Sequence, residues 1–312
     1  MKIKKPIFWD KKKPNFLTYI LFPLTFLIKI NNIIIKFFTK KKFNQIKTIC
    51  VGNIYLGGTG KTPTSLKLYQ ILKTKKYNTV IGKKYYSNQK DEIILLKNKS
   101  NFISSKNREK IIKIAIDKNY ELIIFDDGLQ ERRIHYDLRF VCFDSKIWLG
   151  NRYLIPSGPL RENIYSLKKY DGVFLNGNDE ETIKIKKTLR AINPNLKIFE
   201  AQYFVSNIDR HDQNQNYIAF SGIGNPNSFL KTLKKNQFKI IKSFTFPDHY
   251  NYSELDLIKI KKTASNLKAK IITTEKDYNR INNLNYNGIE FLKVNLKIEN
   301  KIELINFLNN LI

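Results

Sequence analysis

The hydrophobic and polar positions of this chain form two alternating patterns. Short apolar runs bounded by polar residues are typical of buried strands, and longer stretches with apolar residues three or four apart are typical of helices. Helices are expected at about 62–73 and 108–118. The runs that predict strands before residue 200 are Lys47–Val51, Thr79–Gly82, Glu121–Phe125, Arg139–Phe143 and Gly172–Leu175. This alternation favours an α/β fold with a parallel sheet.

A second series of elements begins near residue 205. A helix is expected from about Ser228, and Ser253 and Asp256 have the spacing of a capping box that opens another helix, running to about Leu267. The predicted strands are Tyr217–Phe220, Lys239–Phe244, Lys270–Thr273 and Glu290–Val294. We therefore expect three parts, which are an N-terminal segment 1–40, a first α/β domain 41–205 and a second, smaller α/β domain 206–312.

The N-terminal segment contains an uncharged apolar run, residues 15–28, with lysines on both sides. As a helix this run covers about 21 Å, whereas a bilayer core needs about 30 Å. Pro23 is expected to kink the helix, and Lys29 and Lys36 interrupt its continuation. An apolar helix lying in the membrane interface is favoured over a spanning one. A buried core helix is the alternative, and a signal peptide is not expected because no small-residue cleavage site follows.

Composition narrows the classes of protein. The 312 residues include 56 Lys and Arg against 27 Asp and Glu, a net charge of +29, and 42% are hydrophobic, which excludes a disordered polyelectrolyte. The charge is spread along the chain without a block of six basic residues. An anionic substrate or membrane surface is therefore favoured over nucleic acid. Cys50 and Cys142 lie in apolar runs and are expected to be buried thiols of a cytosolic protein.

The most specific local motif is a glycine-rich loop after the first predicted strand. It consists of Gly57, Gly58, Thr59, Gly60, Lys61 and Thr62. Glycines allow successive backbone N–H groups to surround phosphate oxygens, and the following helix directs its positive end at the same anion. Lys61 is expected to reach the β- and γ-phosphates and Thr62 to offer a hydroxyl to Mg²⁺, while Pro63 suits the first helical turn. Tyr55 replaces the usual first glycine of such a loop.

Two acidic residues, Asp126 and Asp127, end the predicted strand 121–125. The tip of a parallel strand near the loop that follows the first strand is where a magnesium-holding carboxylate belongs. An Asp-Asp-Gly sequence alone is often only a turn. Together with the lysine of the glycine-rich loop, it favours a metal site.

Several segments, taken in order, carry a family resemblance. They are Val51-Gly52-Asn53, Gly58-Thr59-Gly60-Lys61-Thr62-Pro63, Asp126-Asp127-Gly128-Leu129-Gln130, Pro156-Ser157-Gly158-Pro159-Leu160-Arg161-Glu162, Phe246-Pro247-Asp248-His249-Tyr250 and Thr273-Thr274-Glu275-Lys276-Asp277. In this order the chain resembles the tetraacyldisaccharide 4′-kinase family, the lipid A 4′-kinases. The resemblance implies a P-loop NTPase-like parallel-sheet domain and a second α/β domain, with the active site in the cleft between them.

The resemblance also implies a reaction and its residues. The γ-phosphoryl group of ATP, with Mg²⁺ as cofactor, moves to the 4′-hydroxyl of a tetraacyl disaccharide 1-phosphate at the cytoplasmic face of the inner membrane. Asp91 and His249 match the family's Asp–His pair and act with Lys61, and Arg161 and Glu92 are further candidates for substrate binding. The expected partners are an anionic glycolipid and the membrane surface, with peripheral or monotopic attachment through the N-terminal helix. No nucleic acid and no obligate protein partner are expected.

The chain also departs from the family. The usual Arg-Gly-Tyr-Gly segment is replaced by Lys83-Lys84-Tyr85-Tyr86, and Lys90 replaces the glycine before Asp91, so the loop carrying Asp91 is expected to differ in shape. A GTP-binding P-loop switch of the metallochaperone type is the alternative function. Its guanine-reading motif resembles the segment 274–277, although Lys and Asp are adjacent there. A nucleic-acid-binding ATPase is a third hypothesis, motivated only by the charge.

Overall fold

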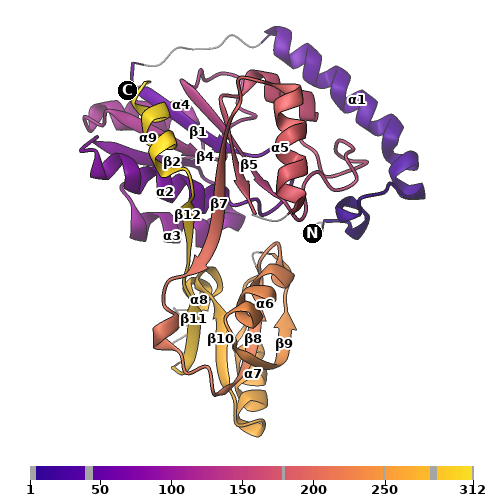
Figure 1. Cartoon of the computed structure of the whole chain (residues 1–312), viewed down its shortest axis with the longest axis vertical. Coiled ribbons are helices and arrows are strands. Elements are labelled where there is room, and N and C mark those ends of the chain that lie inside the picture. The colour runs from indigo at the N-terminus through magenta and orange to yellow at the C-terminus, as the bar shows by residue number, and fades with distance from the viewer. Residues whose placement is uncertain (1–4, 39–44, 178–179, 249, 282–286, 311–312) are drawn as a thin grey trace. The chain divides into compact units, whose positions relative to one another are not determined.

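The computed structural model describes residues 5–38, 45–177, 180–248, 250–281 and 287–310. Contacts divide the chain into two compact units, both visible in Figure 1. Unit 1 comprises Met1–Tyr85, Lys99–Gln202 and Leu296–Ile312, and unit 2 comprises Tyr86–Asn98 and Tyr203–Asn295. The chain thus enters unit 2 twice and returns to unit 1 at its C-terminal end. The boundary expected at 205–206 lies close to the second entry at Tyr203, whereas the inclusion of residues 86–98 in unit 2 and the return at Leu296 were not predicted.

Unit 1 contains an eight-stranded sheet with the order β12-β7-β6-β5-β1-β4-β2-β3. Neighbouring strands from β3 to β7 are parallel. The strands are β1 (Lys47–Gly52), β2 (Thr79–Lys84), β3 (Phe102–Ser105), β4 (Leu122–Asp126), β5 (Leu138–Asp144), β6 (Gly172–Asn176), β7 (Lys197–Val205) and β12 (Val294–Ile298). The central strands are buried along almost their whole length, which explains their continuous apolar runs. The expected α/β fold with a mostly parallel sheet is confirmed.

Helices also belong to unit 1, and three of them connect strands of the sheet along the chain. They are α1 (Phe16–Phe38), α2 (Lys61–Thr74), α4 (Arg108–Asp117), α5 (Glu180–Ile192) and α9 (Lys301–Asn309). Helix α9 belongs to the core of unit 1, because Phe307 lies 6.1 Å from Phe140 and 5.9 Å from Phe199, measured between ring centroids. Both cysteines are free and fully or almost fully buried, as expected.

Unit 2 contains a smaller parallel sheet with the order β11-β10-β8-β9. Its strands are β8 (Asn216–Ser221), β9 (Lys239–Thr245), β10 (Lys270–Thr274) and β11 (Ile289–Leu292). Its helices are α3 (Lys90–Lys99), α6 (Pro226–Lys235), α7 (Glu254–Asn266) and α8 (Glu275–Ile281). The predicted capping box is confirmed, since the Ser253 hydroxyl accepts from the Asp256 N–H and the Asp256 carboxylate accepts from the Ser253 N–H.

Two element predictions need correction. The single strand expected at Glu290–Val294 is two strands, because β11 ends at Leu292 and β12 begins at Val294. The segment around Asp91, expected to be a loop, is the first turn of α3, where carboxylates are favoured by the positive end of the helix dipole. Strand β7 was not predicted, because its partial burial gives no continuous apolar run.

Helix α1 runs along the periphery of unit 1 (Figure 1), and of its side chains described at 16–30 the buried ones are polar. Thr18 and Thr25 are 0% and 2% exposed, whereas Phe16 is 77% exposed and Leu27 is 61% exposed. The Thr25 hydroxyl lies 2.7 Å from the Ser157 hydroxyl, which fixes the helix on the loop after β5. Among the helices of the described residues, none combines the length and apolarity needed to cross a bilayer.

Candidate active site

The phosphate-binding loop connects β1 to α2. Gly57 and Gly60 have positive φ angles of 149° and 90°, in the region that favours glycine. Gly60 is the N-cap of α2, Lys61 is its first residue and Pro63 lies in its first turn, as predicted. The N–H groups at this helix end have no partner within the helix, so they are available to an anion. Gly58 and Thr59 complete the loop before α2.

Side-chain contacts from Asn53 and Tyr55 hold the start of this loop. The Asn53 amide group donates to the carbonyl oxygen of Gly57 at 3.1 Å and to the hydroxyl of Thr59 at 3.0 Å. The side chain of Tyr55 is fully buried, and its hydroxyl contacts Asp10 and accepts from Lys5. Tyrosine therefore replaces the usual glycine without entering the glycine-rich turn, because its side chain packs against the N-terminal segment.

Asp126 ends β4 and is fully buried beside the loop. Its carboxylate accepts from the Thr62 hydroxyl and the Ser65 hydroxyl, each at 3.1 Å. The Lys83 ammonium lies 2.7 Å from the same oxygen that Thr62 contacts. Lys83 comes from the end of β2, which pairs directly with β4, so that Lys83 and Asp126 face each other across the two strands. Parallel neighbours end at one edge of the sheet, which brings the predicted threonine and aspartate together.

Asp127 has a φ angle of 63° and turns its carboxylate toward two cations. One oxygen lies 3.8 Å from Lys61 Nζ, and the other accepts from Arg161 Nη1 at 3.0 Å. Burial opposes the charged form, but the nearby Lys61 and Arg161 lower the pKa of Asp127 below its usual value. Asp127 therefore stays ionised at neutral pH. The structure thus brings together five predicted residues of unit 1, which are Lys61, Thr62, Asp126, Asp127 and Arg161.

The donor atoms at this edge of the sheet fit magnesium. The Thr62 hydroxyl and the carboxylates of Asp126 and Asp127 are all oxygen donors, the kind that Mg²⁺ prefers. In phosphoryl-transfer sites this ion is held by one or two protein oxygens together with phosphate oxygens, so a complete cage of side chains is not required.

Asp91 and Glu92 belong to unit 2 and lie in the first turn of α3. Asp91 is buried, with only 4% of the residue exposed. Its carboxylate accepts from Arg280 at 2.7 Å, and the Glu92 carboxylate accepts from Lys276 at 2.8 Å. Both cations come from α8. His249, the other member of the expected pair, lies outside the described residues.

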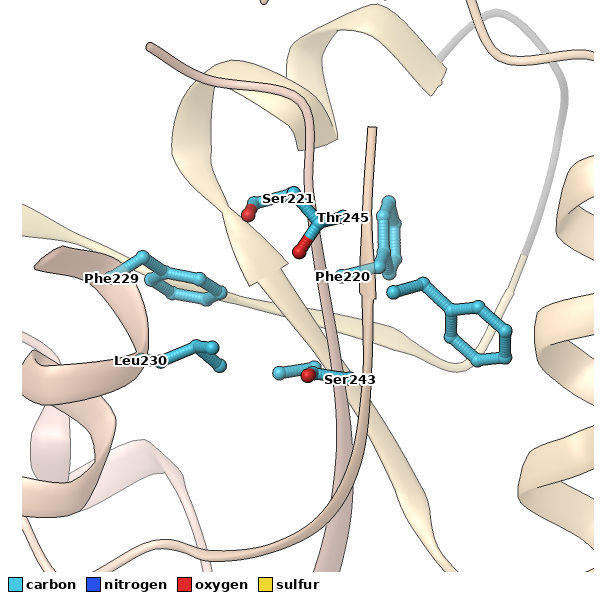
Figure 2. Close-up of a pocket in the computed structure, with 8 residues that line it drawn as sticks. Phe220, Ser221, Phe229, Leu230, Ser243 and Thr245 are labelled. Atoms are coloured by element: carbon cyan, nitrogen blue, oxygen red, sulfur yellow. The ribbon is translucent and has the colours of Figure 1, made fainter. Parts of the chain in front are cut away.

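A small recess in unit 2 is lined by residues of α6, β8 and β9 (Figure 2). It offers no volume that a water molecule could occupy. In Figure 2 the hydroxyl groups of Ser221 and Thr245 lie near each other, and Phe229 and Leu230 border the recess on one side. None of the described lining residues is charged, so the recess lacks the cations that a phosphorylated ligand requires.

Four residues of these networks had no role predicted from the sequence, namely Asn53, Ser65, Lys83 and Arg280. Ser65 lies one helical turn after Lys61, on a face that the loop motif already orients. Lys83 and Arg280 reach their partners over 43 and 189 residues of sequence. For Lys83 the available signal was a basic residue directly after the predicted strand 79–82, which becomes informative only once the strand order is known.

A strand, a glycine-rich loop with a lysine and threonine, and a strand-end aspartate define the class of P-loop phosphotransferases. A family model described as tetraacyldisaccharide-1-P 4′-kinase matches residues 17–312. The chain belongs to the tetraacyldisaccharide 4′-kinase family, which decides between a kinase and the GTP-binding switch considered above.

Individual relatives agree over nearly the whole length. The tetraacyldisaccharide 4′-kinase of Pelagibacter ubique is 47% identical over 308 residues, covering 98% of this chain and 97% of that protein. The protein of the same name from Rickettsia bellii is 37% identical and covers 96% of each chain. A crystal structure of LpxK from Aquifex aeolicus in complex with ATP matches the fold with a TM-score of 0.71 at 24% identity, covering 95% of this chain and 99% of that one.

Proposed function

We propose that this enzyme transfers the γ-phosphoryl group of ATP to the 4′-hydroxyl of a tetraacyl disaccharide 1-phosphate, a lipid A precursor. The observation that carries the proposal is the cluster of Lys61, Thr62, Asp126, Asp127 and Arg161 at one edge of the parallel sheet. Family membership over residues 17–312 supports the acceptor. The Aquifex protein with the same fold was crystallised with ATP, which supports the donor.

Each residue of unit 1 has a proposed task that follows from its chemistry. The loop N–H groups and Lys61 bind the β- and γ-phosphates and stabilise the charge that develops during transfer. Arg161 supplies a second fixed cation, held by Asp127 and by the Gln130 side chain at 3.1 Å. Thr62, Asp126 and Asp127 would hold Mg²⁺, which supplies further charge neutralisation on the phosphates when bound.

Asp91 is the proposed general base, and His249 is its proposed partner. A sugar hydroxyl is a poor nucleophile until a base accepts its proton, and a buried carboxylate can do this when it is held in a fixed orientation. The support from the structure is the burial of Asp91 and its place at the start of α3. Glu92, held by Lys276, remains a candidate for acceptor binding.

We also propose that α1 attaches the enzyme to the cytoplasmic face of the membrane and lies in the interface. Its support is the inverted pattern of burial, in which threonines face the protein and bulky apolar side chains face outward. Such a surface is unfavourable in water and favourable at the boundary of acyl chains and headgroups. The excess of positive charge, +29, would add attraction to anionic lipids.

The proposed reaction is tested with purified enzyme, Mg-ATP and the disaccharide 1-phosphate in detergent, with identification of the lipid product by mass spectrometry. A bisphosphorylated product carrying the new phosphate at the 4′ position is expected. The Lys61→Ala variant should lose transfer, because the cation of the phosphate-binding loop no longer stabilises the charge on the γ-phosphate. Absence of the bisphosphate, although ATP is bound, would contradict the proposed function.

The proposed base is tested separately by two variants. Asp91→Asn and His249→Ala should each lower kcat by about 100-fold or more, the range of general base catalysis, while the affinity for ATP is kept. The matched control is Asp212→Asn, because Asp212 is an exposed aspartate of unit 2. A loss of ATP affinity equal to the loss of rate would contradict the assigned roles.

A further inference from the structure

Three charged residues of unit 2 form a buried cluster around the guanidinium of Arg280. Arg280 Nη2 donates to Asp91 at 2.7 Å, and Nη1 donates to Asp277 at 2.7 Å and to the carbonyl oxygen of Gly222 at 2.6 Å. The side chains of Arg280, Asp91 and Asp277 are 8%, 3% and 0% exposed. The planar guanidinium has fixed donor directions, so these contacts also fix where the Asp91 carboxylate lies.

Asp277 anchors the guanidinium on its other side. One carboxylate oxygen accepts from the Gly222 N–H at 3.1 Å and from the Tyr252 hydroxyl at 2.9 Å, and the other accepts from the Thr274 hydroxyl at 2.6 Å. Gly222 directly follows β8, Thr274 ends β10 and Tyr252 precedes α7, so these partners come from the sheet of unit 2 and its immediate surroundings. Arg280 is therefore anchored to the sheet, and through its contact with Asp91 it also fixes the start of α3.

Arg280 is shared between two carboxylates, those of Asp91 and Asp277. A carboxylate paired alone with an arginine is a weak base, because the cation favours its ionised form. Asp277 offsets part of this effect, since it shares the same cation. Asp91 can thus be positioned by Arg280 without losing the ability to accept a proton.

We propose that Arg280 is a positioning residue for phosphoryl transfer, which holds the Asp91 carboxylate in place while Asp277 keeps it basic enough to act. This inference rests on the proposed role of Asp91 as general base. In the step, the acceptor hydroxyl gives its proton to Asp91 as its oxygen bonds to the γ-phosphorus. The bond from that phosphorus to the bridging oxygen breaks, and its electron pair leaves with ADP. Proton uptake neutralises the Asp91 carboxylate.

The test measures kcat against pH for Arg280→Gln, Arg280→Lys and Asp277→Asn. Removing the cation raises the pKa of Asp91, so in Arg280→Gln the acid limb of kcat should move to higher pH by about one unit. A misplaced base should also lower kcat by about 100-fold, with KM for ATP unchanged. Arg280→Lys keeps the positive charge, so the acid limb of the kcat profile should stay near its wild-type pH and part of kcat should be kept. Asp277→Asn removes a negative charge, so its limb should move to lower pH.

The opposite shifts in the glutamine and asparagine variants distinguish positioning from a general structural defect, which would not move the limb. Arg139→Gln is the matched control, because Arg139 forms an Arg–Asp pair with Asp171 in unit 1 and its kcat profile should not change. If Arg280→Gln fails to fold, Arg280→Lys and Asp277→Asn still give the comparison. If the acid limb of the kcat profile does not move in the folded variants while Asp91→Asn is inactive, the positioning role of Arg280 is wrong and the proposed base still stands. An active Asp91→Asn contradicts the proposed base itself.

Discussion

At the scale of single residues, the need to compensate a buried charge explains the contacts of Asp126 at the edge of the sheet in unit 1. The Asp126 carboxylate is fully buried, and a buried charge without partners is costly. Two hydroxyls and the Lys83 ammonium satisfy it, with the lysine at 2.7 Å. Thr62 and Asp126 were predictable because a local motif fixes each of them. Lys83 was not, because its contact depends on β2 and β4 being neighbours.

Lys83→Met should destabilise the protein by about 3 kcal/mol, because it leaves the buried Asp126 carboxylate without its cation. The measurement is urea unfolding at pH 7, with the free energy of unfolding compared to the wild-type chain. Lys73→Met is the matched control, since Lys73 is an exposed lysine on α2 and its loss should change stability by no more than about 0.5 kcal/mol. Equal effects of the two substitutions would contradict a structural ion pair.

At the scale of elements, α1 is held by a mixture of polar and aromatic contacts. The Asn151 side chain donates to Thr18, Thr25 contacts Ser157, and the rings of Tyr19 and Phe22 pack edge-on against Tyr153. The apolar run was evident from the sequence. Which of its faces meets the protein was not, because apolar residues are found on every side of the helix and only the contacts decide.

Leu24→Gln combined with Leu27→Gln should weaken binding to anionic vesicles by about tenfold or more, because burying each leucine side chain contributes about 1.5–3 kcal/mol. Both leucines are exposed, at 49% and 61%, and the substitutions leave the net charge unchanged. Vesicle sedimentation measures the effect. The control is Leu255→Gln with Ile302→Gln, two apolar residues that are 77% exposed on other helices. Unchanged partitioning of the α1 variant would contradict interfacial attachment.

At the scale of the whole molecule, the two units are not consecutive pieces of the chain. Residues 86–98 join unit 2, and residues 296–312 join unit 1. The expected second domain, 206–312, therefore contains α9, whose Phe307 packs in unit 1, and lacks α3, which carries Asp91. Alternation of strands and helices was sufficient to predict two α/β parts, but it cannot assign an isolated helix to one of two sheets.

A fragment of residues 206–312 should accordingly lack a cooperative thermal transition. Without Asp91, the buried Arg280 loses a charged partner, and the apolar side chains of α9 lose the ring contacts of Phe140 and Phe199. Circular dichroism during heating measures this, with the full chain as reference. A fragment that unfolds as sharply as the full chain would show that α3 is dispensable for unit 2.

The sequence by itself determined the class of fold, the phosphate-binding loop and the family, because these depend on short-range patterns. The glycine-rich turn, its lysine and the helix that follows are contiguous, so one short stretch of sequence contains the whole phosphate-binding motif. Tertiary structure alone decided that Lys83 meets Asp126, that Arg280 meets Asp91 and that α1 faces outward with its apolar side. These contacts join residues far apart in the chain, and strand order and packing, which no local pattern encodes, bring them together.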